Sequence, residues 1–424
     1  ALAGIFFSTE TYFGTVQSLG NRRSSRLMTL PVETAATEGK PLTAESRARL
    51  EKILADSRKQ RDEMSAKARK DRQNGTGDPL VSFLQIRRVS DRMNTVTAQL
   101  NSYTEDGKAK PQAMGVRDRG YARDTRLLER GEIRQPKQVV PRGFVSIVNP
   151  DFRSYFNRRD SGRRQLAEWM VAPGNPLTSR VMVNRIWHHL LGRGIVPSTD
   201  NFGVLGEAPT HPVLLNDLAA RFVKNNWSLK WLHREILQSA TWQQSIHNPA
   251  AQKADPANEH LARMNRRRLD VEAWRDAMLH ASGQLDKTLG GAPQDLDAKD
   301  NRRRTLYGAI HRREPNQFLR IHDFPDPTAH APTRPQTITP LQQLFTLNGP
   351  FIHRQAEALA ASLMKQKGTE ARITAAHQKL FQRPPRKTEL KIAIAFLAGN
   401  ENDVTAWTQY AHALLAGNEF QFID

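Results

Sequence analysis

Apolar side chains in the second part of the chain recur every three or four positions, which is the spacing of an amphipathic helix. Proline or glycine stands at nearly every junction between these segments, and strand-like runs are scarce. We therefore predict a mainly α protein with a multi-helical C-terminal domain over residues 151–424. The helices predicted there cover 162–171, 178–192, 211–227, 228–245, 268–285, 339–349, 351–366, 370–382, 387–399 and 403–417.

Large apolar side chains on the inner stripes of these helices form the expected core, because burying them removes the most apolar surface from water. The predicted core residues are Trp169, Trp187, Leu190, Phe222, Trp231, Leu237, Trp274 and Phe345.

Residues 43–73 carry many Lys, Arg and Glu around a narrow apolar stripe, which predicts a long helix exposed to solvent over most of its surface. Thr43 is a suitable N-cap, because its hydroxyl can accept a hydrogen bond from a free backbone N–H. The segment GTGDP at 75–79 ends this helix, and a second amphipathic helix is predicted at about 80–102. Together they predict a helical hairpin arm over 43–102.

Residues 103–150 contain short alternating runs, AMGVRD at 113–118 and TRLLERG at 125–131, followed by a proline-anchored stretch. These features predict a small β-hairpin connector and an extended linker, with strands confined to about 110–148. Residues 1–42 mix apolar residues with Ser, Thr and Gly, and we interpret them as the tail of a preceding domain.

The composition excludes several kinds of chemistry. The chain has 424 residues and no cysteine, so disulfides, thiolate zinc sites, cysteine nucleophiles and covalently attached haem c are excluded within it. The mean hydropathy is −0.62, and no apolar run approaches the length that a membrane-spanning helix needs. GxSxG, GxGxxG and GxxxxGK[ST] motifs are also absent from the sequence.

The chain is strongly basic, with 63 Lys and Arg against 43 Asp and Glu and a net charge of +20. Such a surface attracts polyanions, including nucleic acid and acidic or sulfated polysaccharide, but it also fits a basic proteome or a high-salt habitat. The arginine runs are short and scattered, and they are not interleaved with aromatic residues that would stack on bases. Binding of nucleic acid is therefore the least supported of these alternatives.

Two charged segments are candidate sites. The loop HDFPDPTAH at 322–330 holds two histidines, two aspartates and the prolines Pro325 and Pro327. Because a residue before proline is held extended, we predict no metal there and expect Asp323 or Asp326 to accept hydrogen bonds from Arg or backbone N–H groups. The segment 267–276 carries mixed charges, and at i, i+3 spacing Glu272 can pair with Arg275. We favour a structural ion-pair network there over a ligand-binding or catalytic pair of carboxylates.

The sequence resembles one family, the planctomycete-specific C-terminal domain of unknown function (PSD-one). NPLTSRVMVNRIWHHLLGRGIVPSTDNFG at 175–203 resembles its most recognisable block, and VPRGF at 140–144 resembles the segment that leads into it. NRRRLDVEAWRDAMLHASGQLD at 265–286 and DFPDP at 323–327 resemble later blocks. Polar positions in the matched blocks are the best candidates for a shared ligand-binding site. They are Asn184, Arg185, Asp200, Arg268, Asp270, Arg275, Asp323 and Asp326.

The resemblance implies an exported protein of the periplasm or cell surface. Domains of this family usually close longer polypeptides that begin with a c-type cytochrome domain. Any haem c would then belong to that upstream domain. The leading hypothesis is a non-catalytic scaffold or binding module for a partner protein or an anionic polysaccharide. The alternatives are a redox or hydrolytic enzyme acting on carbohydrate, and nonspecific nucleic-acid binding. A cleft gathering Arg185, Asp200, Asp270 and Asp323 would favour the enzyme, whereas separate ion pairs would favour the scaffold.

Overall fold

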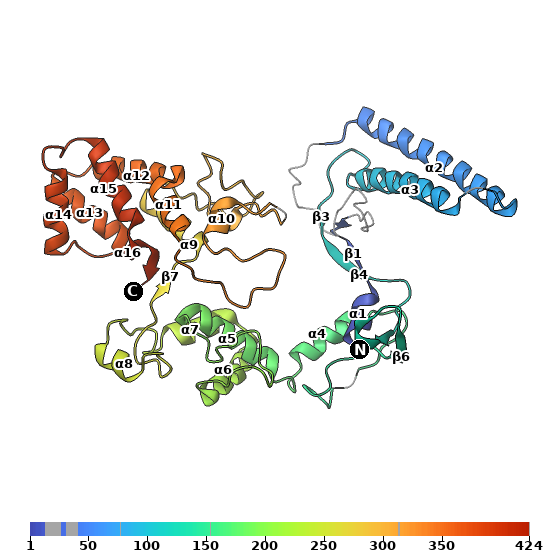
Figure 1. Ribbon diagram of the computed structural model, residues 1–424, viewed down its shortest axis with the longest axis horizontal. Coiled ribbons are helices and arrows are strands. Elements are labelled where there is room, and N and C mark those ends of the chain that lie inside the picture. The colour runs from blue at the N-terminus through green and yellow to red at the C-terminus, as the bar shows by residue number, and fades with distance from the viewer. Residues whose placement is uncertain (13–26, 31–40, 77, 153, 313, 424) are drawn as a thin grey trace. The chain divides into compact units, whose positions relative to one another are not determined.

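The computed structural model describes residues 1–12, 27–30, 41–76, 78–152, 154–312 and 314–423 (Figure 1). The chain divides into two compact units, 1–176 and 177–424. The described residues are mainly helical, with small two-stranded antiparallel sheets, as the sequence predicts. None of the described helices combines the length and the apolar run that a membrane crossing requires.

The first unit combines helices with short strands. Its helices are α1 (Leu2–Phe7), α2 (Ala44–Gln73), α3 (Pro79–Asn101) and α4 (Arg163–Val171). Its strands are β1 (Thr9–Tyr12), β2 (Met28–Thr29), β3 (Gln112–Ala113), β4 (Gly115–Asp118), β5 (Thr125–Leu128) and β6 (Pro136–Val140), and the 3₁₀ turn η1 (Glu129–Gly131) follows β5.

Helices α2 and α3 lie side by side and form the predicted helical hairpin (Figure 1). Thr43 caps α2 by accepting a hydrogen bond from the backbone N–H of Ser46 at 3.2 Å. The hairpin buries Val89, Met93 and Val96 on one stripe of α3. Burial of this apolar stripe stabilises two helices whose remaining surface is exposed to solvent.

The connector contains a β-hairpin as predicted, but its strands differ from those expected, because β5 pairs with β6 from the expected linker and the run at 113–118 pairs as β4 with β1. The expectation that strands are confined to about 110–148 was wrong, because β1 pairs with β4 and β2 pairs with β3. Strands β1 and β2 come from residues 1–30, where the sequence shows no alternation of apolar and polar residues that would predict strands. Much of the expected N-terminal tail, residues 13–26 and 31–40, lies outside the described residues, as does residue 77 of the helix-ending segment.

The second unit is a helical assembly. Its helices are α5 (Leu177–Leu191), α6 (Pro212–Lys224), α7 (Leu229–Leu237), α8 (Pro249–Ala254), α9 (Val271–Ala281), α10 (Gln317–Ile321), α11 (Pro340–Asn348), α12 (Pro350–Leu363), α13 (Thr369–Phe381), α14 (Lys387–Leu397), α15 (Val404–Ala416) and α16 (Asn418–Gln421). The 3₁₀ turn η2 (Thr305–Tyr307) and the strands β7 (Arg267–Arg268) and β8 (Phe422–Ile423) complete it.

Two apolar clusters hold this unit together. One packs α5, α6 and α7 around Trp187, Phe222 and Leu232, and the other packs α9 through α16 around residues such as Trp274 and Trp407. Burial of large side chains at this density contributes most of the driving force for folding.

Of the eight predicted core residues, Trp187, Phe222 and Trp274 are buried. The other five are only partly buried, because helix amphipathicity predicts the direction of a side chain but not how completely neighbouring elements cover it. These five are Trp169, Leu190, Trp231, Leu237 and Phe345.

Two glycines in the best-matched block have a steric role. Gly192 ends α5 at φ +85°, a left-handed conformation that other residues rarely adopt. At Gly194, a Cβ atom would lie 2.6 Å from the carbonyl oxygen of Val196 and 2.9 Å from the side-chain amide of Asn184. The turn after α5 can therefore close tightly only with glycine at this position.

Candidate functional site

A small cavity lies where β7, the start of α9, the end of α10 and α16 meet. Its volume is about 20 Å³, which is roughly the room for one water molecule. Three candidate residues from the sequence line it, together with neighbours that the sequence did not single out. The lining residues are Arg268, Leu269, Asp270, Val271, Trp274, His322, Asp323, Arg334, Pro335, Gln336 and Gln421.

Asp323 is fully engaged by hydrogen bonds. The backbone N–H of Thr337 donates to its Oδ2 at 2.9 Å, the Thr337 hydroxyl donates to Oδ1 at 2.7 Å, and Gln342 Nε2 donates to Oδ2 at 3.2 Å. Arg268 Nη1 lies 3.6 Å from the same carboxylate, and both side chains are mostly buried. The expectation that Asp323 accepts hydrogen bonds is confirmed, and these contacts hold the loop 334–337 against β7.

The second ion pair of the cavity joins Arg334 to Glu272. Two hydrogen bonds of 2.6 and 2.8 Å link the guanidinium to the two carboxylate oxygens, and these bonds raise the Arg334 pKa. Asp270, at the N-cap of α9, lies 3.8 Å from the same guanidinium, and its side chain is 51% exposed.

The pairing of Glu272 with Arg275 that the helical spacing permits does not form. Arg275 is only 1% exposed and donates to the carbonyl oxygens of Arg303 at 3.0 Å and Asn301 at 2.8 Å, and to the Thr305 hydroxyl at 3.2 Å. Arg275 lies on the buried side of α9, whereas Glu272 is partly exposed and pairs with Arg334, so the two residues serve different parts of the structure despite their i, i+3 spacing.

Three polar atoms of cavity-lining residues are buried without a hydrogen-bond partner among the described residues: His322 Nε2, Trp274 Nε1 and Gln421 Nε2. His322 Nδ1 lies 2.8 Å from the Phe318 carbonyl oxygen and therefore carries the proton. Burial lowers the pKa of His322, which leaves its Nε2 as a hydrogen-bond acceptor, whereas the Trp274 and Gln421 nitrogens are donors.

The other candidates lie outside this cavity. Asn184 is fully buried, and its amide exchanges two hydrogen bonds with the backbone of Val196, at 2.8 and 2.9 Å. Asp326 accepts from the backbone N–H and hydroxyl of Thr328 at 2.8 and 2.7 Å, which lowers its pKa. Asp200 is exposed.

Arg185 is exposed as well. Its positive charge adds to the lowering of the His188 pKa, which partial burial causes first. The structure thus brings together Arg268, Asp270 and Asp323 and leaves the other five candidates elsewhere. Among the described residues, no three His, Asp or Glu side chains converge as metal ligands would.

Sequence reasoning missed Arg334 and Gln421, which complete the cavity. Arg334 stands alone in a proline-rich loop, and Gln421 is 4% exposed near the C-terminus. Only the position of Arg334 between two prolines could have indicated that its loop is stiff.

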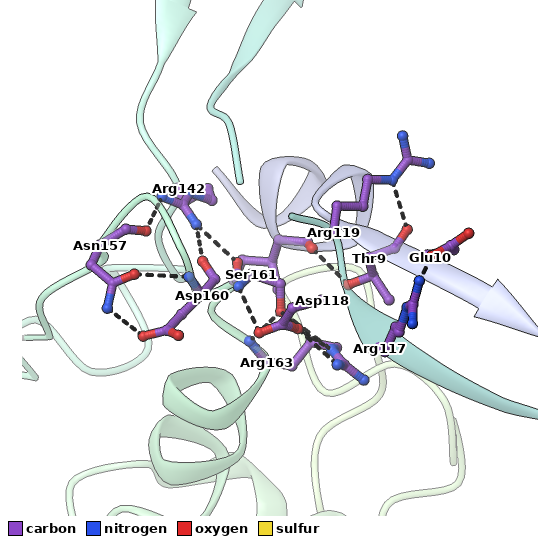
Figure 2. A network of polar contacts seen from close by, with 11 residues as sticks. Thr9, Glu10, Arg117, Asp118, Arg119, Arg142, Asn157, Asp160, Ser161 and Arg163 are labelled. Atoms are coloured by element: carbon purple, nitrogen blue, oxygen red, sulfur yellow. Dashed lines mark hydrogen bonds and ion pairs between the residues drawn. The ribbon is translucent and has the colours of Figure 1, made fainter. Parts of the chain in front are cut away.

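A second polar network holds the first unit together (Figure 2). Asp118 accepts hydrogen bonds from the Ser161 hydroxyl at 2.6 Å and from Arg163 Nη2 at 2.7 Å. Arg142, from the VPRGF segment, is buried and donates to the carbonyl oxygens of Asn157, Asp160 and Ser161. These charges are engaged within the network, which gives Arg142 a clear structural role.

A family model described as PSD1, a protein of unknown function (DUF1553), matches residues 162–397. The chain belongs to the PSD1 family. The resemblance that the sequence blocks indicated is therefore confirmed over that range, which is more than half of the chain and contains every cavity-lining residue except Gln421. PSD1 is a planctomycete-specific domain of unknown function, so membership supplies no reaction. No curated protein and no solved structure matches the chain.

Proposed function

We propose that this PSD1 protein is a non-catalytic scaffold that binds an anionic polysaccharide, is exported to the periplasm or cell surface, and accompanies a c-type cytochrome domain. The observation that carries the proposal is the state of two carboxylates, Asp323 in the cavity wall and Glu272 beside it. Asp323 is held by Arg268, Thr337 and Gln342, while Glu272 is held by Arg334. The two acids serve in separate ion pairs: that of Asp323 joins a loop to β7, and that of Glu272 joins α9 to the loop that carries Arg334.

The enzyme alternative requires carboxylates that are free to react. A cleft gathering Arg185, Asp200, Asp270 and Asp323 would have supported it, but only Asp270 and Asp323 line the cavity. A space of about 20 Å³ is also far below the roughly 300–1,000 Å³ of ordinary ligand pockets. The arrangement therefore favours a structural role, in which these residues hold neighbouring segments of the second unit together.

The excess of 63 basic over 43 acidic residues supports an anionic ligand. Charges spread over a folded surface raise the rate and strength of association with polyanions, and this attraction falls steeply with salt. A polysaccharide is preferred to nucleic acid because the arginine runs of the sequence lack the interleaved aromatic residues that single-stranded bases stack on.

The test is binding of purified protein to heparin and to duplex DNA of similar length over a salt series. We expect heparin to bind more tightly than DNA at each salt concentration and to remain bound at about 0.5 M salt, where purely nonspecific attraction is largely screened. Equal binding with equal salt dependence would instead support a nonspecific basic surface. Absence of heparin binding at low salt would refute the proposal.

A further inference from the structure

An open cleft in the second unit, separate from the cavity above, has the size of a ligand site. It runs between α12 and the segment 299–302, and its open volume is about 380 Å³, within the usual range of small-molecule pockets. We call it the basic cleft. The side chains that give it its chemistry are Gln284, Lys299, Arg302, Arg354, Gln355 and Glu357.

Three cations of the basic cleft differ from the arginines around the cavity. Lys299, Arg302 and Arg354 have no side-chain ion pair or hydrogen bond within the part of the chain that the structure describes. The one acid of the cleft, Glu357, is exposed and lies 3.4 Å from Nε2 of His353. The cleft therefore carries an excess of positive charge that the protein itself does not neutralise.

The backbone holds one of these cations in place. The carbonyl oxygen of Arg302 accepts a hydrogen bond from the backbone N–H of Asp286 at 2.9 Å. The next residue, Arg303, is buried and donates to the carbonyl oxygens of Thr288 and Ala292. Because successive side chains of an extended segment point to opposite sides, burial of Arg303 leaves Arg302 on the open side, in the cleft.

A buried amide adds neutral hydrogen-bonding capacity. Gln355 is 6% exposed, and its Oε1 accepts a hydrogen bond from the Ser282 hydroxyl at 2.7 Å. This bond fixes the side chain and leaves the amide N–H groups as donors at the wall of the cleft. A fixed amide donor beside guanidinium and ammonium groups suits a hydroxylated anion, because the hydroxyl and the anionic group need different partners.

We infer that the basic cleft binds a saccharide carrying carboxylate or sulfate groups, with Arg302, Arg354 and Lys299 holding the anionic group and Gln355 donating to a hydroxyl or ring oxygen. This inference rests on the proposed function and names the site and the ligand group that serve it. Guanidinium groups suit planar or tetrahedral oxyanions because they can donate two parallel hydrogen bonds.

The test compares two triple variants that remove the same charge. The cleft variant is Lys299→Gln with Arg302→Gln and Arg354→Gln, and the control variant is Lys253→Gln with Arg234→Gln and Arg320→Gln. Binding of a short heparin-derived oligosaccharide is measured by titration calorimetry, after circular dichroism has shown that both variants unfold at the wild-type temperature. We expect the cleft variant to lose about tenfold or more in affinity, since hydrogen bonds to charged groups are strong, and the control to lose less than about threefold.

A parallel titration with sodium sulfate identifies the source of the oxyanion. The inference expects sulfate to bind the wild-type protein much more weakly than the oligosaccharide does. Equal affinities would show an oxyanion site with no preference for saccharide and would overturn the inference. Equal losses in the two triple variants would also overturn it while leaving the proposed function intact. If the wild-type protein bound neither the oligosaccharide nor heparin, the proposed function itself would be refuted.

Discussion

Three arginines are buried within the described part of this protein, and their guanidinium groups are satisfied largely by backbone carbonyl oxygens. Arg142, Arg275 and Arg303 each donate to at least two such oxygens. A planar fork of five N–H donors can reach several carbonyls at once, so these residues join loops that no regular structure connects.

Arg275→Met should destabilise the protein by about 2–5 kcal/mol, because it leaves buried carbonyl oxygens without donors. Arg304→Met is the matched control, since Arg304 is about half exposed and its contact with Asp276 is 3.6 Å long. Urea denaturation measures both. Similar losses in the two variants would contradict the structural role of Arg275.

The Asp323 side chain allows a prediction about metal. Its carboxylate already accepts three hydrogen bonds from Thr337 and Gln342, so we expect purified protein to contain no stoichiometric metal that depends on it. Asp323→Ala should lower stability and leave the metal content unchanged. Elemental analysis that found one metal per chain in wild-type protein and none in the variant would overturn this prediction and strengthen the enzyme alternative.

At the scale of elements, the helices of the second unit are arranged by short caps and turns as well as by apolar stripes. Thr339 and Gln342 form a capping box at the start of α11, and the Gln342 amide also reaches Asp323. A local helix signal is thus tied to the cavity by a single side chain. After α5, away from the cavity, Gly194 lets a tight turn close on the buried side-chain amide of Asn184.

Trp187→Ala should cost roughly 3–5 kcal/mol, as truncation of a large buried aromatic does in other cores. Trp187 is 5% exposed and packs in the cluster of α5, α6 and α7. Tyr155→Ala, at a side chain in the first unit that is 82% exposed, is the control and should change the free energy of unfolding by less than about 0.5 kcal/mol. A negligible loss in chemical denaturation of the Trp187 variant would show that this cluster is not a core.

At the scale of the whole molecule, the buried histidines predict how the stability of the folded protein depends on pH. His322 and His377 are buried, and burial lowers the pKa of each. The folded state then binds fewer protons than the unfolded state below the ordinary histidine pKa of about 6.5. Stability is therefore complete above that pH and decreases as the pH falls through it toward the lower folded-state values.

His322→Gln should reduce this loss of stability on acidification. The measurement is the free energy of unfolding by urea at pH 7 and pH 5, in wild-type protein and in the variant. We expect the difference between the two pH values to be smaller in His322→Gln. His330→Gln, at an exposed position of the same loop, should leave the difference unchanged. An unchanged difference in both variants would show that His322 does not contribute.

The sequence by itself determined the helical character of the second unit, the helical hairpin of residues 44–101 and the presence of a small β-hairpin in the connector, although not which strands pair in it. It also located the blocks that identify the family. These features depend on contacts within a few turns or across one loop, so the periodicity of nearby side chains and the chemistry of caps and turns are enough to reveal them. That Asp323 or Asp326 accepts hydrogen bonds rather than binding metal was also predicted from the sequence, because Pro325 and Pro327 favour an extended backbone at Phe324 and Asp326.

Only the tertiary structure decided which polar residues meet. Strand β7, Arg267–Arg268, pairs with Phe422 and Ile423 near the C-terminus. Glu272 pairs with Arg334 rather than with Arg275. Lys299 and Arg302 line one cleft together with Arg354. Each of these contacts joins segments separated by many residues. No local pattern encodes such a contact, since it depends on how the packed helices place their loops in space.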